Sequence, residues 1–302
     1  MQQRQPMYLM NKKMSAPYIS IITVVYNDKK GMEFTAKSVA SQTALSQAEW
    51  IIIDANSQDG TKDIINKYKE YATYTISEPD EGIYYGMNKG IAIAKGKYCI
   101  FMNAGDSFYD NTVIENIIKE PFFGNTDYIL GNSKEEKGGR IIGSYISPKK
   151  ITARFFFTAS LCHQSTLIST ERLKKFGGYD TKYRITADAK FFFEDLILRD
   201  ATFNNTDIII STYNVEGISY IQASEAYKEK QEFLNELIKP RIKKDIDKVT
   251  FGETPIEKVL CKIHEKSFRY KTIQTLAILM YSPTALNNRI RMIFRNKKKT
   301  NL

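Results

Sequence analysis

Residues 19–26 read ISIITVVY, and this run of β-branched and aliphatic side chains decides the fold. Its lack of hydrophobic–polar alternation is typical of a strand that is buried on both faces of a parallel sheet. Asn27 and Asp28 follow the run and can cap a helix that we expect to reach about Gln42. A strand followed directly by a helix is the first unit of an α/β sheet.

The β-then-α pattern repeats up to about residue 106. We predict further strands at 50–54, 74–77 and 97–102, and helices at 62–71 and 82–95. Repeated units of this kind predict an α/β fold with a mostly parallel, doubly wound sheet. In such sheets, ligands bind beyond the carboxyl ends of the strands.

Polar side chains gather just past the end of each of these four predicted strands. They are Tyr26 and Asn27, Asp54 and Asn56, Glu78 and Asp80, and Asn103 and Asp106. Because the carboxyl ends of parallel strands lie at one edge of the sheet, we expect these residues to converge on a binding site there. Asp106 supplies a carboxylate of the kind that binds Mg²⁺ or Mn²⁺. The structural alternative is that Asp106 makes a turn or caps a helix near Asn111.

Past about residue 128 the pattern loosens into shorter elements. We expect strands at 127–131, 140–146, 163–168 and 202–213. We expect helices at 187–198 and 224–238. We interpret this part as the second half of the same domain. The predicted organisation is an N-terminal extension (1–17), the α/β domain (18–240) and a C-terminal extension (241–302), with a linker-like stretch at 240–255.

The composition is that of an ordinary globular protein with excess positive charge. The 302 residues are 42% hydrophobic, and the formal net charge is +10. Three cysteines without metal-type spacing indicate a reducing compartment rather than a disulfide framework. The N-terminal residues lack the apolar core of a signal peptide, and no apolar run is long enough to span a bilayer. We therefore expect a cytoplasmic protein.

Much of the positive charge lies in the C-terminal extension, which we expect to be helical. Residues 285–302 combine an apolar stripe with Arg and Lys, including three consecutive lysines. A basic amphipathic helix of this kind can bind an anionic membrane, here the inner face of the cytoplasmic membrane. The alternative is a solubilising basic tail. Because the charge is terminal rather than on the folded domain, we expect no nucleic-acid partner.

Five stretches of the chain resemble the family 2 glycosyltransferases, which are inverting enzymes with the GT-A fold. The match looks closest to the bacterial members that build cell-surface polysaccharides. The stretches lie between about residues 19 and 194 and read ISIITVVYN, IIIDANSQDGT, SEPDEGIYYGMNKGIAIAKGKYCIFMNAGD, CHQSTLI and GGYDTKYRITADAKFFFE. The family often has two adjacent acids at its metal site, whereas here Gly105 precedes Asp106.

The resemblance implies a metal-dependent, inverting transfer from a UDP-sugar to a lipid-linked or growing saccharide. The transferred group would be a hexosyl or N-acetylhexosaminyl unit. By position, Asp106 would hold Mg²⁺ or Mn²⁺, and Asp188 would be the general base that takes the acceptor's proton. The resemblance also places a set of residues around the nucleotide sugar: Val24, Tyr26, Asn27, Asp54, Asp80, Lys89, Asn103 and His163.

Structural interpretations and other functions stay open beside this one. Asp188 could be an acid favoured at a helix N-terminus, and Lys89 could belong to a solvated helix face. A nucleotidyltransferase would need a Gly-rich phosphate loop after the first strand, and TVVYNDKKG is not one. A non-catalytic glycan-binding relative would not need both Asp106 and Asp188.

Overall fold

The computed structural model describes residues 16–215, 217 and 222–251. The chain forms two compact units, Met1–Leu237 and Ile238–Leu302. In the second unit the described part is helix α10 (Pro240–Phe251). Most of the predicted linker at 240–255 is therefore helical in the structure. Ile242, Ile246 and Val249 recur there at helical spacing, a signal hidden among charged residues. The remaining C-terminal predictions, from residue 252 onward, lie outside the described residues.

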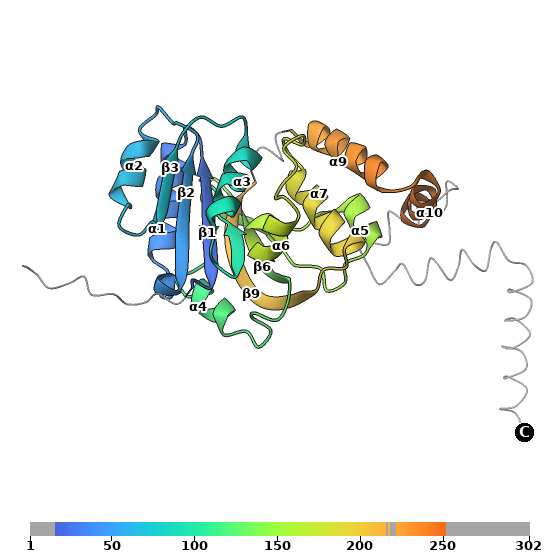
Figure 1. Cartoon of the computed structure of the whole chain (residues 1–302), viewed down its shortest axis with the longest axis horizontal. Coiled ribbons are helices and arrows are strands. Elements are labelled where there is room, and N and C mark those ends of the chain that lie inside the picture. Colours follow the sequence, from blue (N-terminus) through green and yellow to red (C-terminus); the bar gives the residue numbers. More distant parts are fainter. Residues whose placement is uncertain (1–15, 216, 218–221, 252–302) are drawn as a thin grey trace, which may run out of the picture. The chain divides into compact units, whose positions relative to one another are not determined.

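The first unit is built on a sheet, for which the structure describes nine strands (Figure 1). These are β1 (Ile19–Val25), β2 (Ala48–Asp54), β3 (Tyr74–Ser77), β4 (Tyr98–Phe101), β5 (Ser107–Phe108), β6 (Tyr128–Lys137), β7 (Arg140–Tyr145), β8 (Thr166–Ser169) and β9 (Phe203–Asn214). Their order is β3-β2-β1-β4-β8-β6-β9-β5, and β7 pairs with β6.

The parallel part of the sheet lies where the sequence predicts it. β1 pairs in parallel with both β2 and β4, and β2 pairs in parallel with β3. Val25 lies opposite Asp54, and Asp54 lies opposite Ser77, so the carboxyl ends of three strands align at one rim. Beyond β4 the directions mix, because β8 is antiparallel to both β4 and β6, whereas β6 and β9 are parallel. The predicted α/β class is confirmed.

Helices cover both faces of the parallel part. The α-helices that the structure describes in this unit are α1 (Lys29–Ala40), α2 (Thr61–Lys67), α3 (Ile83–Ile93), α4 (Val113–Ile118), α5 (Ala153–Thr158), α6 (Thr170–Lys175), α7 (Ala187–Phe193) and α9 (Ala223–Leu237). Buried side chains of α1, α2 and α4 form one apolar cluster with Ile21 and Trp50. On the opposite face α3 packs against β1 so closely that a Cβ on Gly90 would lie 2.6 Å from Ile22 Cγ2. The sheet is therefore doubly wound there.

Several boundaries differ from prediction, mainly in the second half of the domain, past about residue 128. The predicted strand 163–168 begins as a 3₁₀ turn (His163–Ser165), and only then continues as β8. Helix α7 passes into a π-helical turn (Glu194–Leu198), and α2 ends at Lys67 rather than at residue 71. The prediction missed β5, α5 and α6, which are too short for a periodic signal. Helix α4 lies where the alternative for Asp106 places a helix, but Thr112 rather than Asp106 is its N-cap residue.

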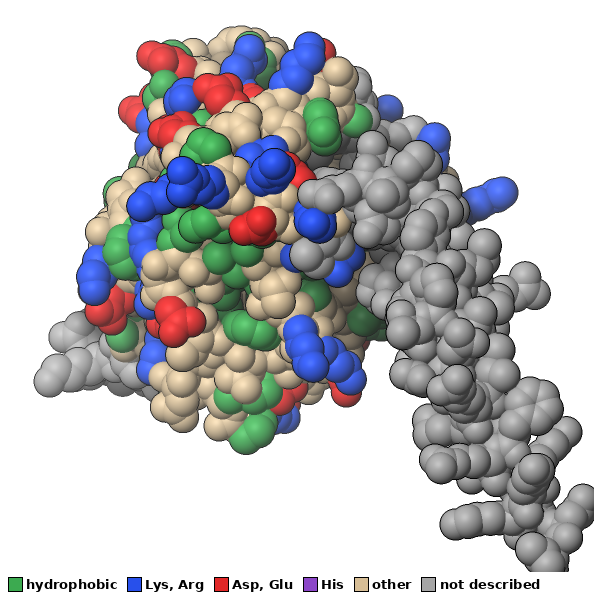
Figure 2. Space-filling model, turned by 90° about the vertical axis from the view of Figure 1, so that its right-hand side faces the viewer, with side chains coloured by type: hydrophobic (Ala, Val, Ile, Leu, Met, Phe, Trp, Pro, Cys, Tyr) green, Lys and Arg blue, Asp and Glu red, His purple; other side chains and the backbone are tan. Residues whose placement is uncertain are grey.

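No helix in the described part of the chain is long and apolar enough to cross a membrane. On the face drawn in Figure 2, Lys and Arg side chains of the described residues are interspersed with acidic and hydrophobic ones. They do not form a single continuous basic field on this visible face.

Candidate active site

The loop after β4 carries Asn103 and Asp106 along the end of β1. Backbone pairing continues into this loop, because Met102 N–H donates to Ile22 O (2.9 Å) and Ala104 N–H donates to Val24 O (3.1 Å). Gly105 then adopts a φ of +95°, a conformation that glycine tolerates and other residues rarely adopt. A second acid at residue 105 would therefore be strained in this turn.

Thr35 of α1 fixes the same loop from the side of the helix. Its buried hydroxyl oxygen accepts a hydrogen bond from Gly105 N–H (3.0 Å). The hydroxyl lies 2.6 Å from Asp106 O and 3.0 Å from Asn103 O, so its one hydrogen points to these two carbonyls. The sequence reasoning missed Thr35, because a threonine inside a helix carries no signature of this task.

The Asp106 carboxylate is buried, with 8% of the residue exposed. Its Oδ1 lies 3.5 Å from Gln164 Nε2, and no Lys or Arg within the described ranges forms an ion pair with it. Burial raises the pKa of Asp106 to about 6, although the charge of His163 and the Gln164 contact act in the opposite direction. A bound cation would offset this cost of burying the charged form.

The fit to a divalent cation rests on this carboxylate. Among the residues that the structure describes, no three His, Cys, Asp or Glu side chains cluster as a complete metal site. Mg²⁺ commonly keeps one or two protein carboxylates and completes its shell with water and phosphate oxygens. Asp106 therefore fits a cation shared with a diphosphate, and it does not fit an all-protein metal cage.

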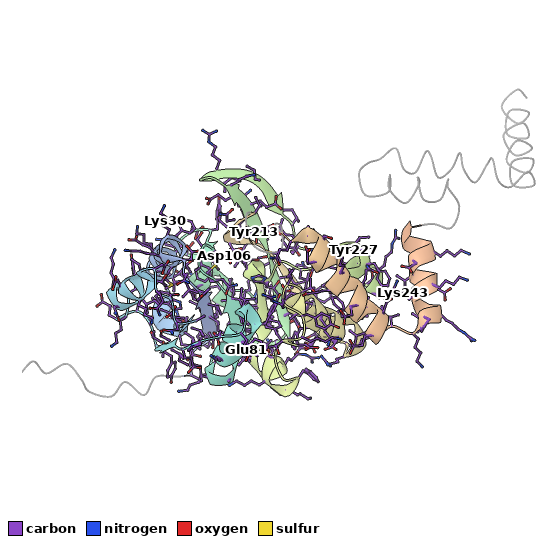
Figure 3. The ribbon with its side chains drawn as sticks, turned by 90° about the horizontal axis from the view of Figure 1, so that it is seen from above. Lys30, Glu81, Asp106, Tyr213, Tyr227 and Lys243 are labelled. Carbon is purple, nitrogen blue, oxygen red and sulfur yellow. The ribbon has the colours of Figure 1, made fainter. Side chains whose placement is uncertain are left out.

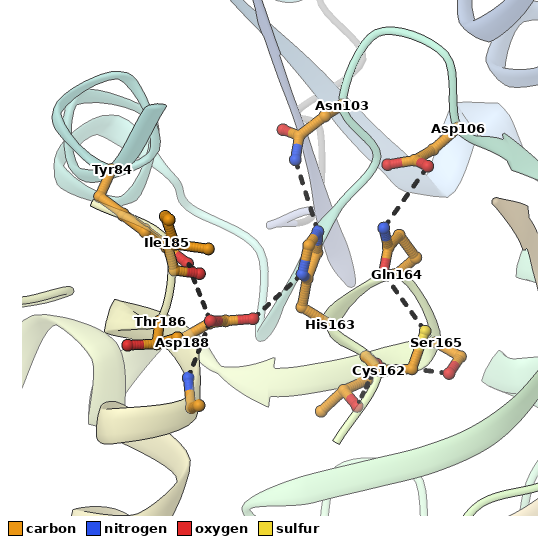
Figure 4. A network of polar contacts seen from close by, with 12 residues as sticks. Tyr84, Asn103, Asp106, Cys162, His163, Gln164, Ser165, Ile185, Thr186 and Asp188 are labelled. Carbon is orange, nitrogen blue, oxygen red and sulfur yellow. Dashed lines mark hydrogen bonds and ion pairs between the residues drawn. The ribbon is translucent and has the colours of Figure 1, made fainter. Parts of the chain in front are cut away.

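A row of polar side chains joins Asn103 to Asp188 through His163 (Figure 4). His163 Nδ1 is 3.1 Å from Asp188 Oδ2, and His163 Nε2 is 3.5 Å from Asn103 Nδ2. Because the Asn103 amide nitrogen only donates, Nε2 is the accepting nitrogen in this arrangement and Nδ1 carries the hydrogen. Burial lowers the pKa of His163, but the hydrogen bond to Asp188 and the charges of Asp188 and Asp106 outweigh burial and raise it.

Tyr84 of α3 approaches the same carboxylate from its other side. Its hydroxyl lies 2.8 Å from Asp188 Oδ1 and 2.9 Å from Ile185 O. Burial, reinforced by the charge of Asp188, raises the pKa of Tyr84 well above its usual value, so the phenol stays a donor. Asp188 Oδ1 also accepts from Ala189 N–H (2.8 Å). The sequence reasoning missed Tyr84, because the tyrosine lies far from Asp188 in the chain.

The groups around Asp106 and His163 form the wall of one pocket of about 490 Å³. Figure 3 labels Asp106 and Glu81, which belong to this wall. The wall also contains Asn103, Gln164, the start of α3 and part of the loop before α7: Thr181, Tyr183 and Arg184. Asp188 lies behind His163 and is not part of the wall; its side chain is 14% exposed.

Tyr26 and Asn27 lie at the end of β1, as expected, but outside this pocket wall. Tyr26 is 65% exposed. Asn27 connects two loops of the rim, because its N–H donates to Ser57 Oγ (2.8 Å) and its Oδ1 accepts from Gln58 N–H (2.8 Å). Val24 is buried beneath α3, and its N–H donates to Asn103 Oδ1 (3.4 Å).

Asp54 is fully buried at the end of β2 and also lies outside the pocket wall. Its carboxylate accepts from Ser57 N–H (3.1 Å) and from Ser77 Oγ (2.6 Å). These contacts tie the ends of β2 and β3 together. A contact of Asp54 with the base or ribose stays a prediction.

Asp80 and Lys89 form an ion pair beside α3 rather than at the pocket. Lys89 Nζ also lies 2.7 Å from Glu78 Oε1. Burial lowers the pKa of Lys89, but its contacts with Asp80 and Glu78 raise it overall, so Lys89 stays charged. The structure thus gathers Asn103, Asp106, His163 and Asp188 in one hydrogen-bonded region, and it places the remaining predicted residues outside the pocket wall.

A family model described as glycosyl transferase family 2 matches residues 20–175, more than half of the 302 residues. An uncharacterised glycosyltransferase of Mycobacterium tuberculosis is 31% identical over 182 residues, which cover 59% of this chain and 68% of the relative. A second relative is WfaP of Escherichia coli, named a UDP-Glc:alpha-D-GlcNAc-diphosphoundecaprenol beta-1,3-glucosyltransferase. It is 29% identical over 206 residues, covering 66% of this chain and 78% of WfaP.

Solved glycosyltransferase structures share the fold. TarS of S. aureus, residues 1–349 in complex with UDP, aligns with a TM-score of 0.57 at 18% identity, over 88% of this chain and 75% of that one. The mannosyltransferase PcManGT from Pyrobaculum calidifontis, in complex with GDP-Man and Mn²⁺, aligns with a TM-score of 0.58 at 13% identity, over 93% and 85%. The predicted GT-A-like architecture is confirmed. The chain therefore belongs to glycosyl transferase family 2 and is a glycosyltransferase.

Proposed function

We propose that this glycosyltransferase transfers a sugar with inversion from a UDP-sugar to a lipid-linked or growing saccharide, and that it uses Mg²⁺ or Mn²⁺. The observation that carries the proposal is one pocket at the strand ends whose wall holds both Asp106 and His163, with Asp188 directly behind the histidine. A carboxylate for the leaving-group side and an acid–base group for the acceptor side are the two requirements of such a transfer.

Asp106 serves the leaving group in this proposal. It would hold the divalent cation, which when bound supplies positive charge to the departing nucleoside diphosphate. Thr35 keeps the Asp106 backbone in place, and Asn103 of the same loop contacts the histidine. The leaving-group and acceptor sides are thus fixed to each other through side chains of one loop.

Asp188 serves the acceptor together with His163. The acceptor oxygen attacks the anomeric carbon from the face opposite the diphosphate, the bond from that carbon to the diphosphate oxygen breaks, and the hydroxyl proton passes to the His163–Asp188 pair. His163 lines the pocket, and Asp188 stabilises positive charge on the ring from 3.1 Å. Asp188 is the proton-accepting charge of the pair, and Tyr84 orients it.

The relatives support the choice of substrates. The name of the E. coli relative specifies a UDP-sugar donor and a diphosphoundecaprenol-linked acceptor, and the S. aureus neighbour binds UDP. Such an acceptor is lipid-anchored, and it is consistent with a role in surface polysaccharide synthesis at the inner face of the cytoplasmic membrane.

The test is a panel of UDP-sugars incubated with the full chain, Mn²⁺ and a synthetic N-acetylglucosamine diphosphate lipid, with UDP release as the readout. We expect turnover of at least one donor, loss of turnover on adding EDTA, and recovery on adding excess Mn²⁺. If no UDP-sugar is turned over, the proposed donor is wrong. If EDTA leaves the rate unchanged, the proposed metal dependence is wrong.

A further inference from the structure

We propose that Glu229 of α9 is a positioning residue for Asp188, because it holds the backbone from which Asp188 projects. This inference rests on the proposed catalytic function of Asp188. Glu229 lies beyond residue 175, where the family match ends. Figure 3 shows α9, on which Tyr227 is labelled.

The Glu229 carboxylate binds four donors in three consecutive residues. Its Oε1 accepts from Arg184 N–H (2.9 Å). Its Oε2 accepts from Ile185 N–H, Thr186 N–H and Thr186 Oγ1, each at 3.0 Å. Thr186 precedes α7 and makes no side-chain cap of its own, so the glutamate of another helix satisfies these N–H groups. Asp188 lies in the first turn of that helix.

The same backbone is held from the opposite side by α3. The one hydrogen of the Tyr84 hydroxyl is shared between Ile185 O and Asp188 Oδ1, so Ile185 is held through its N–H by α9 and through its carbonyl by α3. Asn88 of α3 fixes the start of the loop, because its amide bonds both the N–H and the carbonyl of Tyr179 at 2.8 Å. The loop from Tyr179 to Asp188 is therefore fixed at several points.

The position of this loop matters to the pocket as well as to Asp188. Arg184, one of the residues bound by Glu229, belongs to the pocket wall, and so does Tyr183, whose hydroxyl donates to Glu236 of α9 (2.9 Å). A shift of the loop would move the acceptor side of the pocket. It would leave the Asp106 loop in place, because Thr35 of α1 holds that loop.

The chain provides a matched control one turn along α9. Glu232 bonds only the exposed ammonium of Lys182 (2.9 Å) among the contacts that the structure describes, and its side chain is 56% exposed. An exposed ion pair of this kind contributes little to the stability of the fold. Glu229→Gln replaces one accepting oxygen by an NH₂ group that faces backbone N–H donors, whereas Glu232→Gln makes the same chemical change at a site without them.

The first readout is hydrogen exchange of the full chain followed by mass spectrometry. In Glu229→Gln we expect the amides of residues 184–186 to exchange about tenfold faster or more, as the loss of a charge-assisted hydrogen bond predicts. In Glu232→Gln they should exchange as in the wild type. Unchanged exchange in Glu229→Gln would overturn the proposed contact, whatever the substrate of the enzyme is.

The second readout separates positioning from folding. The rate is divided by the concentration of UDP-binding sites, which calorimetry counts, so that unfolded protein does not lower kcat. On this scale the kcat of Glu229→Gln should fall about tenfold or more, and its donor KM should stay within about twofold of the wild type. Glu232→Gln should match the wild type in both. If Asp188→Asn is inactive while Glu229→Gln keeps full kcat, positioning by Glu229 is wrong and the catalytic assignment stands. If Asp188→Asn itself keeps full kcat, the catalytic assignment is wrong, and with it the positioning role.

Glu229→Asp provides a second route if Glu229→Gln does not fold. It keeps the charge but shortens the reach, so the same amides should exchange faster and kcat should fall, by less than in a full loss of the contact. Exchange and kcat equal to the wild type in Glu229→Asp would count against the proposal.

Discussion

His163 Nδ1 lies 3.1 Å from Asp188 Oδ2, and this contact places a carboxylate directly behind a ring that lines the pocket. The ring is bounded on its other nitrogen by Asn103, and Asn103 belongs to the same short loop as Asp106. The residues proposed for the leaving group and for the acceptor are therefore neighbours in one hydrogen-bonded row, although they come from distant parts of the chain.

Replacement of Asp106 tests the metal assignment. Asp106→Ala removes the one acid in the loop after β4, so Mn²⁺-dependent binding of UDP should be lost in calorimetry. Asp63→Ala is the control, because Asp63 is an exposed acid on α2. Equal UDP affinity in folded Asp106→Ala and Asp63→Ala would remove Asp106 from the metal site.

Replacement of Thr35 tests how the loop is held. Thr35→Val keeps the shape but leaves the part-buried Gly105 N–H without its acceptor, which should lower the free energy of unfolding by about 1–3 kcal/mol. The affinity for UDP with Mn²⁺ should fall as well, because Asp106 lies in the released loop. Thr35→Ser keeps the hydroxyl and should restore both quantities. Chemical denaturation measures the free energy of unfolding, and calorimetry measures the affinity for UDP. If Thr35→Ser is as impaired as Thr35→Val, the Thr35 hydroxyl does not hold this loop.

Tyr84→Phe tests the orientation of Asp188. The change removes one hydrogen bond to Asp188 Oδ1, so kcat should fall roughly three- to thirtyfold while UDP affinity stays the same. Tyr109→Phe is the control, because Tyr109 is 46% exposed. The account of Tyr84 is wrong if both variants have the kcat of the wild type.

The C-terminal residues carry a prediction from sequence alone. The full chain should co-sediment with anionic liposomes, and salt should weaken the binding, because each Lys or Arg near such a surface contributes about 1 kcal/mol. A version that ends at Tyr281 should sediment poorly and still bind UDP. Equal sedimentation of the two proteins would show that the basic tail is not the membrane contact.

The first half of the fold could be predicted because its signals are local. The apolar run of β1 and the side-chain cap of Asp28, which accepts from Gly31 N–H (2.8 Å), both follow from neighbouring residues. The convergence of Asn103 and Asp106 at the rim follows from the strand directions alone. The short helices α5 and α6 could not be predicted, because tertiary contacts rather than periodic patterns fix them.

The supporting residues of the site were hidden for a similar reason. Tyr84, Thr35 and Glu229 each act through a hydrogen bond to a residue more than forty positions away. A sequence read along the chain does not show such pairings. The family resemblance made Asp188 the base that takes the acceptor's proton, whereas the structure places His163 between that carboxylate and the pocket.

The rate of UDP release by Asp188→Asn, compared with the wild type under the same donor, acceptor lipid and Mn²⁺, tests the central claim most directly. The amide keeps the shape of the side chain but cannot accept the proton or stabilise the charged ring, so the rate should fall by about a hundredfold or more at unchanged UDP affinity. A folded Asp188→Asn variant that releases UDP at the wild-type rate would contradict the assignment of this pocket as the site of transfer.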